Sequence, residues 1–446
     1  MTVEKREELV AKAFAAAKVA EQMHRFYRGK IQIQPKCAIR GVEDFAIWYT
    51  PGVAEACRAI VRDPLEVYEQ TNKWNTVAIV TNGTRVLGLG NIGPEAALPV
   101  MEGKALLFKY LGGVDAVPIC LDARDPEEMI RTTRHLQPAF GGINLEDIEQ
   151  PACFHILDRL REEMTIPVFH DDQQGTATVT LAGLLNALRI VGKPLADVRI
   201  AMVGAGASNI AIARILIAAG ADPGNIVMTD SRGILNRRRT ELRDTHRQKW
   251  TLCLVTNAEN LSGGPAEAMR GADVLIALST PGPDVIKPEW VREMAPDPVV
   301  FACANPVPEI WPWDAKEAGA RIVATGRSDF PNQINNSLGF PAIFRGALDV
   351  RARTITDEMC VAAAQALAGY AQERGLHEDY IVPSMVEWEV YPLVAAAVGE
   401  RAIAQGVARL RPPREQLEAS AREMIRSARE GTRLLMEHGY IPILNL

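Results

Sequence analysis

The chain of 446 residues has few cysteines, and it lacks both an apolar leader and any long hydrophobic run. Its seven cysteines form no Cys-x-x-Cys pair, so we expect reduced, buried thiols rather than disulfides or a thiolate zinc site. No run reaches the roughly 18 apolar residues that a membrane span requires, and the charged N-terminus has no signal-peptide core. These absences predict a cytoplasmic protein without a membrane partner.

An excess of basic charge is also missing. The net charge is −6 and the pI is near 5.8, which argues against nucleic-acid binding and favours a small-molecule partner. With 48% hydrophobic and 23% charged residues, the composition is that of a folded globular protein, long enough for two or three domains.

The apolar patterns predict an α/β protein with three parts. Residues 1–164 begin with a helical face and continue from residue 76 with alternating strand and helix patterns, typical of an N-terminal α/β substrate domain. Residues 165–385 contain five short apolar runs, most of them separated by helix-length segments, which predict a doubly wound, Rossmann-type sheet. Residues 386–446 have helical spacing and predict a C-terminal helical arm. The first helical face consists of Leu9, Val10, Ala13, Phe14 and Ala17, and the last of Leu417, Ala421, Met424, Ile425, Ala428 and Leu435.

The segment VRIAMVGAGASNIAIARIL indicates a dinucleotide site at the start of the second of these parts. It places two glycines between an apolar strand and a helix, where small residues let the backbone approach a pyrophosphate. Asn209 occupies the third position of G-x-G-x-x-G/A, which puts the tightness of helix packing in question. A generic strand-turn-helix is the alternative. The loop residues expected at the coenzyme are Gly204, Gly206, Ala207, Ser208 and Asn209.

The end of the next strand carries mixed signals for the coenzyme. Asp230 can accept a hydrogen bond from a free ribose 2′-hydroxyl and repels a 2′-phosphate. Arg232 and the run Arg237–Arg239 favour a phosphate, although the run could also be a solvated helix face. We therefore expect NAD to be preferred and NADP to be accepted less well.

Three carboxylates, Glu146, Asp147 and Asp172, suit a hard divalent cation. No thiolate cluster lies near them in the sequence, so Mg²⁺ or Mn²⁺ is favoured over zinc. The alternative is that they are surface or helix N-terminal carboxylates. His170 is adjacent, but on a strand that flanks a core it is more often a packed residue than a ligand.

The segment GTRVLGLGNIGPEAALPVMEGKALLFK carries two cations, Arg85 and Lys104, on either side of a glycine-rich stretch. A bound cation nearby would destabilise the ammonium form of Lys104 and could make this lysine a general base, whereas the alternative is a solvated surface lysine. Tyr49, before the turn in YTPGVA, could equally be a partly buried aromatic residue without a catalytic function.

Nine segments in their order and spacing resemble the malic enzymes, in particular the shorter bacterial type, and the resemblance covers nearly all of residues 40–405. The matching segments are YTPGVA, GTRVLGLGNIG, VMEGKALLFK, NLEDI, VFHDDQQGTA, GAGA, ANPVPEI, ATGRSDFPNQINNSLGFP and FRGALDVRA.

The resemblance implies a function for individual residues. Glu146, Asp147 and Asp172 would hold the cation, and Asp171 would orient Lys104 as the general base. Asp171 by itself would raise the pKa of that lysine. Tyr49 would be the general acid. Contacts with the substrate carboxylates are implied for Arg85, Asn305 and Asn336, and Asn305 is also expected beside the coenzyme.

The implied reaction is the metal-dependent oxidative decarboxylation of malate to pyruvate and CO₂ with NAD(P)⁺ as the oxidant. One alternative is a malolactic-type decarboxylase, which retains NAD and releases lactate. A second is a catalytically silent dinucleotide-binding regulator, which would be expected to have lost Lys104, Tyr49 or a metal carboxylate. The resemblance also implies a homodimer or a dimer of dimers. The chain departs from the family pattern at Gln174, Asn209 and Ala342.

Overall fold

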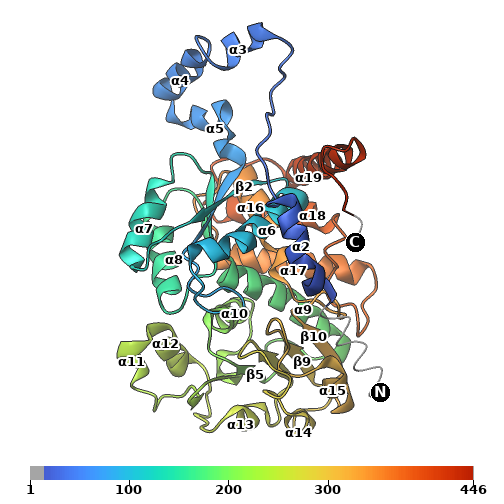
Figure 1. The fold of residues 1–446 in the computed structure, drawn as a ribbon. Helices are drawn as coiled ribbons and strands as arrows, with labels where there is room; N and C mark the ends of the chain where they lie inside the picture. Colours follow the sequence, from blue (N-terminus) through green and yellow to red (C-terminus); the bar gives the residue numbers. More distant parts are fainter. Residues whose placement is uncertain (1–14, 445–446) are drawn as a thin grey trace.

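The computed structural model describes residues 15–444, which form two sheets surrounded by helices (Figure 1). The helical face expected from Leu9 to Ala17 lies outside the residues whose side chains are described. The first described helix is α2 (Ala15–Tyr27). Within residues 15–444, no helix has both the length and the apolar character needed to cross a membrane.

The first sheet has four parallel strands in the order β2-β1-β3-β4. The strands are β1 (Thr76–Thr81), β2 (Asp115–Cys120), β3 (Gly142–Leu145) and β4 (Val168–His170). The helices that connect them are α6 (Pro94–Gly112), α7 (Pro126–His135) and α8 (Ala152–Glu163). Because β4 pairs with β3, this sheet extends past residue 164, where we expected the first domain to end.

The second sheet has six strands in the order β10-β9-β8-β5-β6-β7, and only β7 is antiparallel. Its strands are β5 (Ile200–Val203), β6 (Ile226–Asp230), β7 (Gly233–Ile234), β8 (Val274–Ala277), β9 (Val299–Ala302) and β10 (Ile322–Thr325). The five parallel strands coincide with the five apolar runs, so the prediction of a doubly wound, Rossmann-type sheet is confirmed.

Helices of different length surround this second sheet. The longest are α9 (Thr176–Val191) and α10 (Ala207–Ala218), which pack against each other. The shorter ones are α11 (Leu242–Thr245), α12 (Arg247–Val255), α13 (Pro265–Met269), α14 (Pro288–Arg292) and α15 (Pro312–Glu317).

The C-terminal helices pack against helices of both sheets (Figure 1). They are α16 (Phe340–Asp349), α17 (Asp357–Glu373), α18 (Val390–Ala404) and α19 (Arg414–Glu437). Helices α16 and α19 contact α6, and α17 contacts α9. Leu417, Ala421 and Ile425 are buried on α19, as their helical spacing predicted. One apolar core therefore joins both sheets and the C-terminal helices.

A short helical segment near the N-terminus stands away from this body (Figure 1). We call residues 30–63 the arm; it contains α3 (Val42–Trp48) and α4 (Val53–Arg62). The chain returns to β1 through η1 (Pro64–Glu66), α5 (Val67–Gln70) and η2 (Asn72–Asn75). Helix α4 buries none of its side chains, although many arm residues are apolar. The exposed apolar residues include Ile33, Val42, Phe45, Ile47, Trp48, Tyr49 and Val61.

Candidate functional site

The four expected acidic residues meet where β3 and β4 end. These strands are parallel neighbours, with Leu145 paired to His170, so the residues that follow each strand lie side by side. Glu146 and Asp147 follow β3, and Asp171 and Asp172 follow β4. The sheet register therefore brings together residues that are 25 positions apart in the sequence.

Asp171 and Asp172 serve different neighbours although they are adjacent in sequence. They begin the π-helical turn η3 (Asp171–Gly175), which leads directly into α9. The carboxylate of Asp171 is fully buried and forms an ion pair with Lys104 Nζ. Asp172 Oδ2 instead accepts a hydrogen bond of 2.9 Å from the backbone N–H of Asp147. The turn thus directs one aspartate to the lysine and the other to the carboxylate cluster.

The geometry of Glu146, Asp147 and Asp172 fits a divalent cation. Each offers one carboxylate oxygen, and these three atoms lie within 4.8 Å of one another. Asp147 Oδ2 is buried and has no hydrogen-bond partner, whereas Glu146 Oε2 accepts one from Asn144 Nδ2 at 3.0 Å. A donor set made only of carboxylate oxygens suits Mg²⁺ or Mn²⁺.

His170 does not belong to this set of ligands. Its ring is completely buried, and neither ring nitrogen has a hydrogen-bond partner. Nδ1 lies 3.6 Å from Asp172 Oδ2, but burial lowers the pKa of His170 to about 4 and keeps the ring neutral. His170 is therefore a packed strand residue, as expected.

Lys104 is enclosed by carboxylates, which excludes the alternative of a solvated surface lysine. Its side chain is 11% exposed, and Nζ lies 3.1 Å from Glu146 Oε1 in addition to its pair with Asp171. Burial alone would lower the pKa of Lys104, but Asp171, Glu146 and Asp172 together raise it above its ordinary value. Burial also raises the pKa of Asp147 to about 8, helped by the charge of Asp172. The site thus has more carboxyl groups than Lys104 alone can balance.

Asn336 and Phe340 lie close to Asp171 and Lys104. A Cβ at Gly175 would be 1.8 Å from Asp171 Oδ1 and 3.4 Å from Asn336 Cβ, so Asn336 lies against the η3 turn. The ring centroid of Phe340 is 4.6 Å from Lys104 Nζ. These two residues come from η5 (Asn336–Leu338) and α16, which bring the C-terminal half of the chain to the lysine.

Arg85 and Asn305 come from different sheets but lie in neighbouring loops. The backbone N–H of Arg85 donates a 3.1 Å hydrogen bond to the backbone carbonyl of Asp147, a member of the carboxylate cluster. In the same loop, a Cβ at Gly88 would be 3.0 Å from the carbonyl oxygen of Asn305. Both Arg85 and Asn305 are solvent-exposed.

Tyr49, the expected general acid, is not brought to Lys104 by its own chain in the described residues. It follows α3 on the arm and is 73% exposed, which excludes the alternative of a partly buried aromatic residue. Within residues 15–444, no hydrogen bond, ion pair or ring contact joins Tyr49 to the Lys104 cluster, and the arm stands away from it (Figure 1).

The dinucleotide loop has the expected strand-turn-helix form. Gly204 has a φ of +95°, and a Cβ there would lie 2.4 Å from the carbonyl oxygen of Leu278. Gly206 precedes α10, and a Cβ there would meet nothing within 4 Å, which leaves room for a ligand at the helix N-terminus.

Asn209 tightens this turn instead of loosening it. Its buried Nδ2 donates to the carbonyl oxygens of Val203 at 3.0 Å and Gly204 at 2.7 Å, so it ties α10 to the end of β5. The close packing of α10 against the end of β5, which Asn209 put in question, is therefore maintained by the hydrogen bonds of Asn209 itself. The other two departures, Gln174 and Ala342, are also fully buried.

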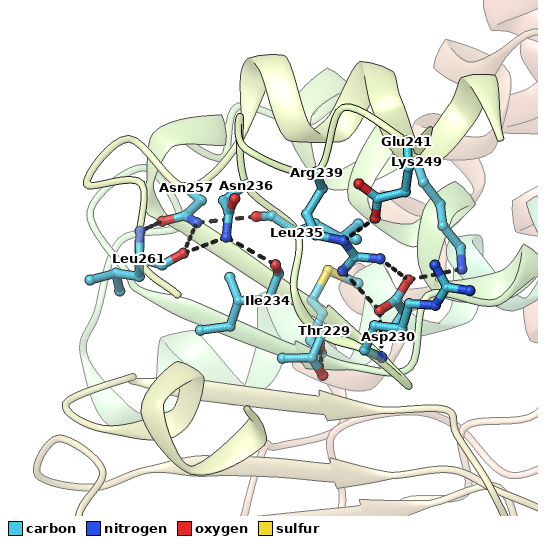
Figure 2. Close-up of polar contacts among 12 residues, drawn as sticks. Thr229, Asp230, Ile234, Leu235, Asn236, Arg239, Glu241, Lys249, Asn257 and Leu261 are labelled. Carbon is cyan, nitrogen blue, oxygen red and sulfur yellow. Dashed lines mark hydrogen bonds and ion pairs between the residues drawn. The ribbon is translucent and has the colours of Figure 1, made fainter. Parts of the chain in front are cut away.

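Asp230 lies at the end of β6 and binds two cations from outside that strand (Figure 2). Arg239 donates to both carboxylate oxygens, at 3.1 and 3.2 Å, and Lys249 Nζ lies 3.3 Å from Oδ2. Arg239 is therefore not part of a solvated helix face, whereas Arg237 and Arg238 are exposed. Sequence reasoning missed Lys249 because it is 19 residues from Asp230 and carries no local signal.

A second missed residue is Glu309, whose carboxylate is fully buried between two loops. It accepts hydrogen bonds from Ser279 N–H at 2.7 Å, from Ser279 Oγ at 3.1 Å and from Ala304 N–H at 3.1 Å. These contacts fasten the loops that follow β8 and β9, and so fix the backbone beside Asn305.

The fold and the site define a class: an α/β protein with a dinucleotide-binding sheet and a lysine-carboxylate cluster beside it. Comparison with known families specifies it further. The family model for the malic enzyme N-terminal domain matches residues 28–161, and the model for the malic enzyme NAD-binding domain matches residues 173–403. The chain belongs to the malic enzyme family.

Individual relatives agree with this assignment. The chain is 53% identical to the NAD-dependent malic enzyme of Geobacillus stearothermophilus, across 85% of this chain and 78% of that protein. It is 48% identical to the bifunctional malic/malolactic enzyme of Bacillus subtilis, across 91% and 97%. The crystal structure of Entamoeba histolytica malic enzyme covers 100% of this chain with a TM-score of 0.96 and 49% identity, and 93% of that chain is matched. Other relatives are named as NADP-dependent malic enzymes.

Proposed function

We propose that the protein catalyses the oxidative decarboxylation of (S)-malate to pyruvate and CO₂, with reduction of NAD⁺ or NADP⁺. The observation that carries this proposal is the position of Lys104 against Asp171 and the three carboxylates Glu146, Asp147 and Asp172. Membership of the malic enzyme family supports it. A cytoplasmic location is part of the proposal.

Glu146, Asp147 and Asp172 are the residues that would hold the divalent cation, Mg²⁺ or Mn²⁺. When bound, the cation supplies positive charge that polarises the oxygens of the substrate and stabilises negative charge on them. The unpartnered Oδ2 of Asp147 and the excess of carboxylates over cationic side chains support this assignment.

Lys104 removes the proton of the C2 hydroxyl while the C2 hydride passes to the nicotinamide. The carboxylates alone favour its ammonium form, and a bound cation would destabilise that form and free the lysine to act as a base. Asp171 orients the lysine through their ion pair, and because it is fully buried it holds Nζ in one place. Arg85, Asn305 and Asn336 line the surrounding loops and hold the substrate carboxylates. The C4 carboxylate then leaves as CO₂, and the electron pair of the broken bond remains on C3.

Tyr49 donates the proton that C3 needs to give pyruvate, and we assign it to the site of a second copy of the chain. The arm that carries Tyr49 exposes many apolar side chains, which a monomer would leave in water. Lys104 has no tyrosine from its own arm beside it. A homodimer in which each arm covers the partner would bury that surface and complete both sites.

The test is product analysis after incubation with malate, Mn²⁺ and either coenzyme. Pyruvate formed in equal amounts with NADH or NADPH is the expected result. Lactate without net reduction of the coenzyme would instead establish a malolactic-type decarboxylase, the second candidate, which the name of the Bacillus subtilis relative favours. A silent dinucleotide-binding regulator would give neither product, but Lys104, Tyr49 and all three metal carboxylates are present in the chain.

A further inference from the structure

The carboxylate of Asp230 has no free hydrogen-bond acceptor site in the structure. Oδ1 accepts from the backbone N–H of Arg232 at 2.9 Å and from Arg239 Nη1 at 3.1 Å. Oδ2 accepts from Arg239 Nη2 at 3.2 Å and from Lys249 Nζ at 3.3 Å. A carboxylate offers about four acceptor sites, and all of them are taken. A ribose 2′-hydroxyl could donate to Asp230 only by displacing one of these protein donors.

The cations around Asp230 have hydrogen-bond donors to spare. Arg239 carries five N–H groups, of which two bind Asp230 and one, on Nε, binds Glu241 at 2.5 Å. Lys249 has three N–H groups and gives one to Asp230. The side chains of Arg239 and Lys249 are 14% and 15% exposed, so their remaining N–H groups are partly shielded from water. The cluster around Asp230 therefore has N–H donors that lack acceptor partners.

The charges around Asp230 balance one another before Arg232 is counted. Two carboxylates, Asp230 and Glu241, face two paired cations, Arg239 and Lys249, so Asp230 is fully compensated (Figure 2). Arg232 adds an exposed positive charge that interacts with Glu241. A compensated Asp230 no longer repels a phosphate strongly, whereas an isolated Asp230 would.

We propose that Arg239 and Lys249 form a subsite for the 2′-phosphate of NADP and decide the coenzyme preference of the reaction proposed above. A phosphate offers only acceptors, and a planar guanidinium beside an ammonium is suited to bind it. Asp230 keeps both cations in position, and Glu241 fixes the plane of Arg239. The subsite favours the 2′-phosphorylated coenzyme, which reverses the preference that Asp230 alone predicts.

The direct test uses fragments of the coenzyme rather than the reaction. Binding of adenosine 2′,5′-bisphosphate and of 5′-AMP to the full chain is measured by titration calorimetry, without malate. We expect the wild type to bind the bisphosphate at least tenfold more tightly. Lys249→Met should reduce this ratio to less than threefold, since Met keeps the length of the side chain and removes its charge. Lys316→Met is the control, because Lys316 forms a comparable 2.8 Å ion pair with Asp379 elsewhere in the same domain.

Equal binding of the two fragments by the wild type would overturn the proposal. So would a Lys249→Met variant that loses both fragments equally, or a Lys316→Met variant that loses the preference as Lys249→Met does. These outcomes are independent of turnover: a chain inactive on malate can still show the preference, and an active chain can lack it. The ratio of kcat/KM for NADP and NAD, measured in the same variants, should change in parallel.

Discussion

The two charged sites of the molecule have opposite imbalances. At the ends of β3 and β4, four carboxylates surround a single ammonium group, Lys104. At the end of β6, a single carboxylate, Asp230, is bound by two cations. The first site has acceptors left over, including the buried Oδ2 of Asp147, and the second has donors left over. An excess of carboxylate oxygens suits a cation, and an excess of N–H donors suits a phosphate.

The largest expected effect is at the first site, where Lys104→Ala removes the only ammonium group among its carboxylates. We expect kcat to fall by about 10²- to 10⁴-fold for both malate oxidation and pyruvate reduction, the usual range for loss of a general base. Lys109→Ala is the matched control, since Lys109 lies on the same helix and pairs with Asp115 at the surface. Steady-state kinetics with circular dichroism of each variant measures this, and a loss below tenfold would contradict the assignment.

The next largest effect is expected at Tyr49, which the first site does not receive from its own chain. Tyr49→Phe should still reduce oxaloacetate to malate while losing most pyruvate formation, because only protonation at C3 depends on it. Co-expression of Tyr49→Phe with Lys104→Ala should then restore about a quarter of wild-type activity. Half of randomly paired dimers are mixed, and each mixed dimer has one complete site out of two.

This restoration distinguishes the two possible sources of Tyr49. If the tyrosine acted within its own chain, every site in a mixed dimer would carry one defective residue and no activity would return. Activity of purified, doubly tagged mixed dimers at the level of the single variants would therefore contradict exchange of the arm.

Removal of the cation should lower the stability of the protein through only one of the two charged sites, the carboxylate cluster around Lys104. At a Mn²⁺ concentration 100 times the dissociation constant, binding adds about 2.7 kcal/mol to the free energy of unfolding. We expect Mn²⁺ to raise the melting temperature of the wild type and of Asp230→Asn, and EDTA to reverse the increase. Asp172→Asn should show little or no increase, since it loses a ligand charge. An equal response of Asp172→Asn in differential scanning fluorimetry would place the cation elsewhere.

The smallest effect is expected at Lys73, a second buried lysine. It shows in which direction the pKa of Lys104 would shift without its carboxylates. Lys73 Nζ donates only to backbone carbonyls, including that of Phe140 at 2.9 Å, and burial together with Arg409 lowers its pKa to about 8. In the unfolded chain a lysine keeps its proton up to about pH 10.4. The unfolded state therefore binds more protons between these values, and this contribution to stability rises with pH across the window.

Lys73→Met should remove this pH-dependent contribution to the free energy of unfolding. Urea unfolding gives the free energy of unfolding of wild type and variant at pH 8 and at pH 10. The change in this free energy between the two pH values is then compared between the two proteins. A difference that is the same in both would mean that Lys73 titrates normally in the folded chain.

Local patterns in the sequence were enough to predict the second sheet, because each of its parallel strands is a short apolar run between turn residues. Helical spacing likewise predicted Leu417, Ala421 and Ile425 on the buried face of α19. The first domain was harder to delimit, because β4 has only three residues and joins its sheet by pairing with β3.

The contacts that span the sequence could not be predicted. Spacing alone did not distinguish Asp171 from Asp172; the family resemblance assigned them different roles, and the η3 turn directs them to different neighbours. Arg239 and Lys249 were not connected to Asp230 because no periodicity links a strand end to a later loop and helix. The position of Tyr49 depends on where the arm lies, and the arm's apolar residues show only that they need a partner surface.

The most direct test of the cation-dependent lysine site is malate-dependent formation of NADH or NADPH, measured with Mn²⁺, after EDTA treatment, and after Mn²⁺ is restored. The account predicts rapid reduction with Mn²⁺, loss of nearly all activity with EDTA and full recovery, with pyruvate as the product each time. Reduction that continues unchanged in EDTA would contradict the assignment of Glu146, Asp147 and Asp172 as ligands of an essential cation.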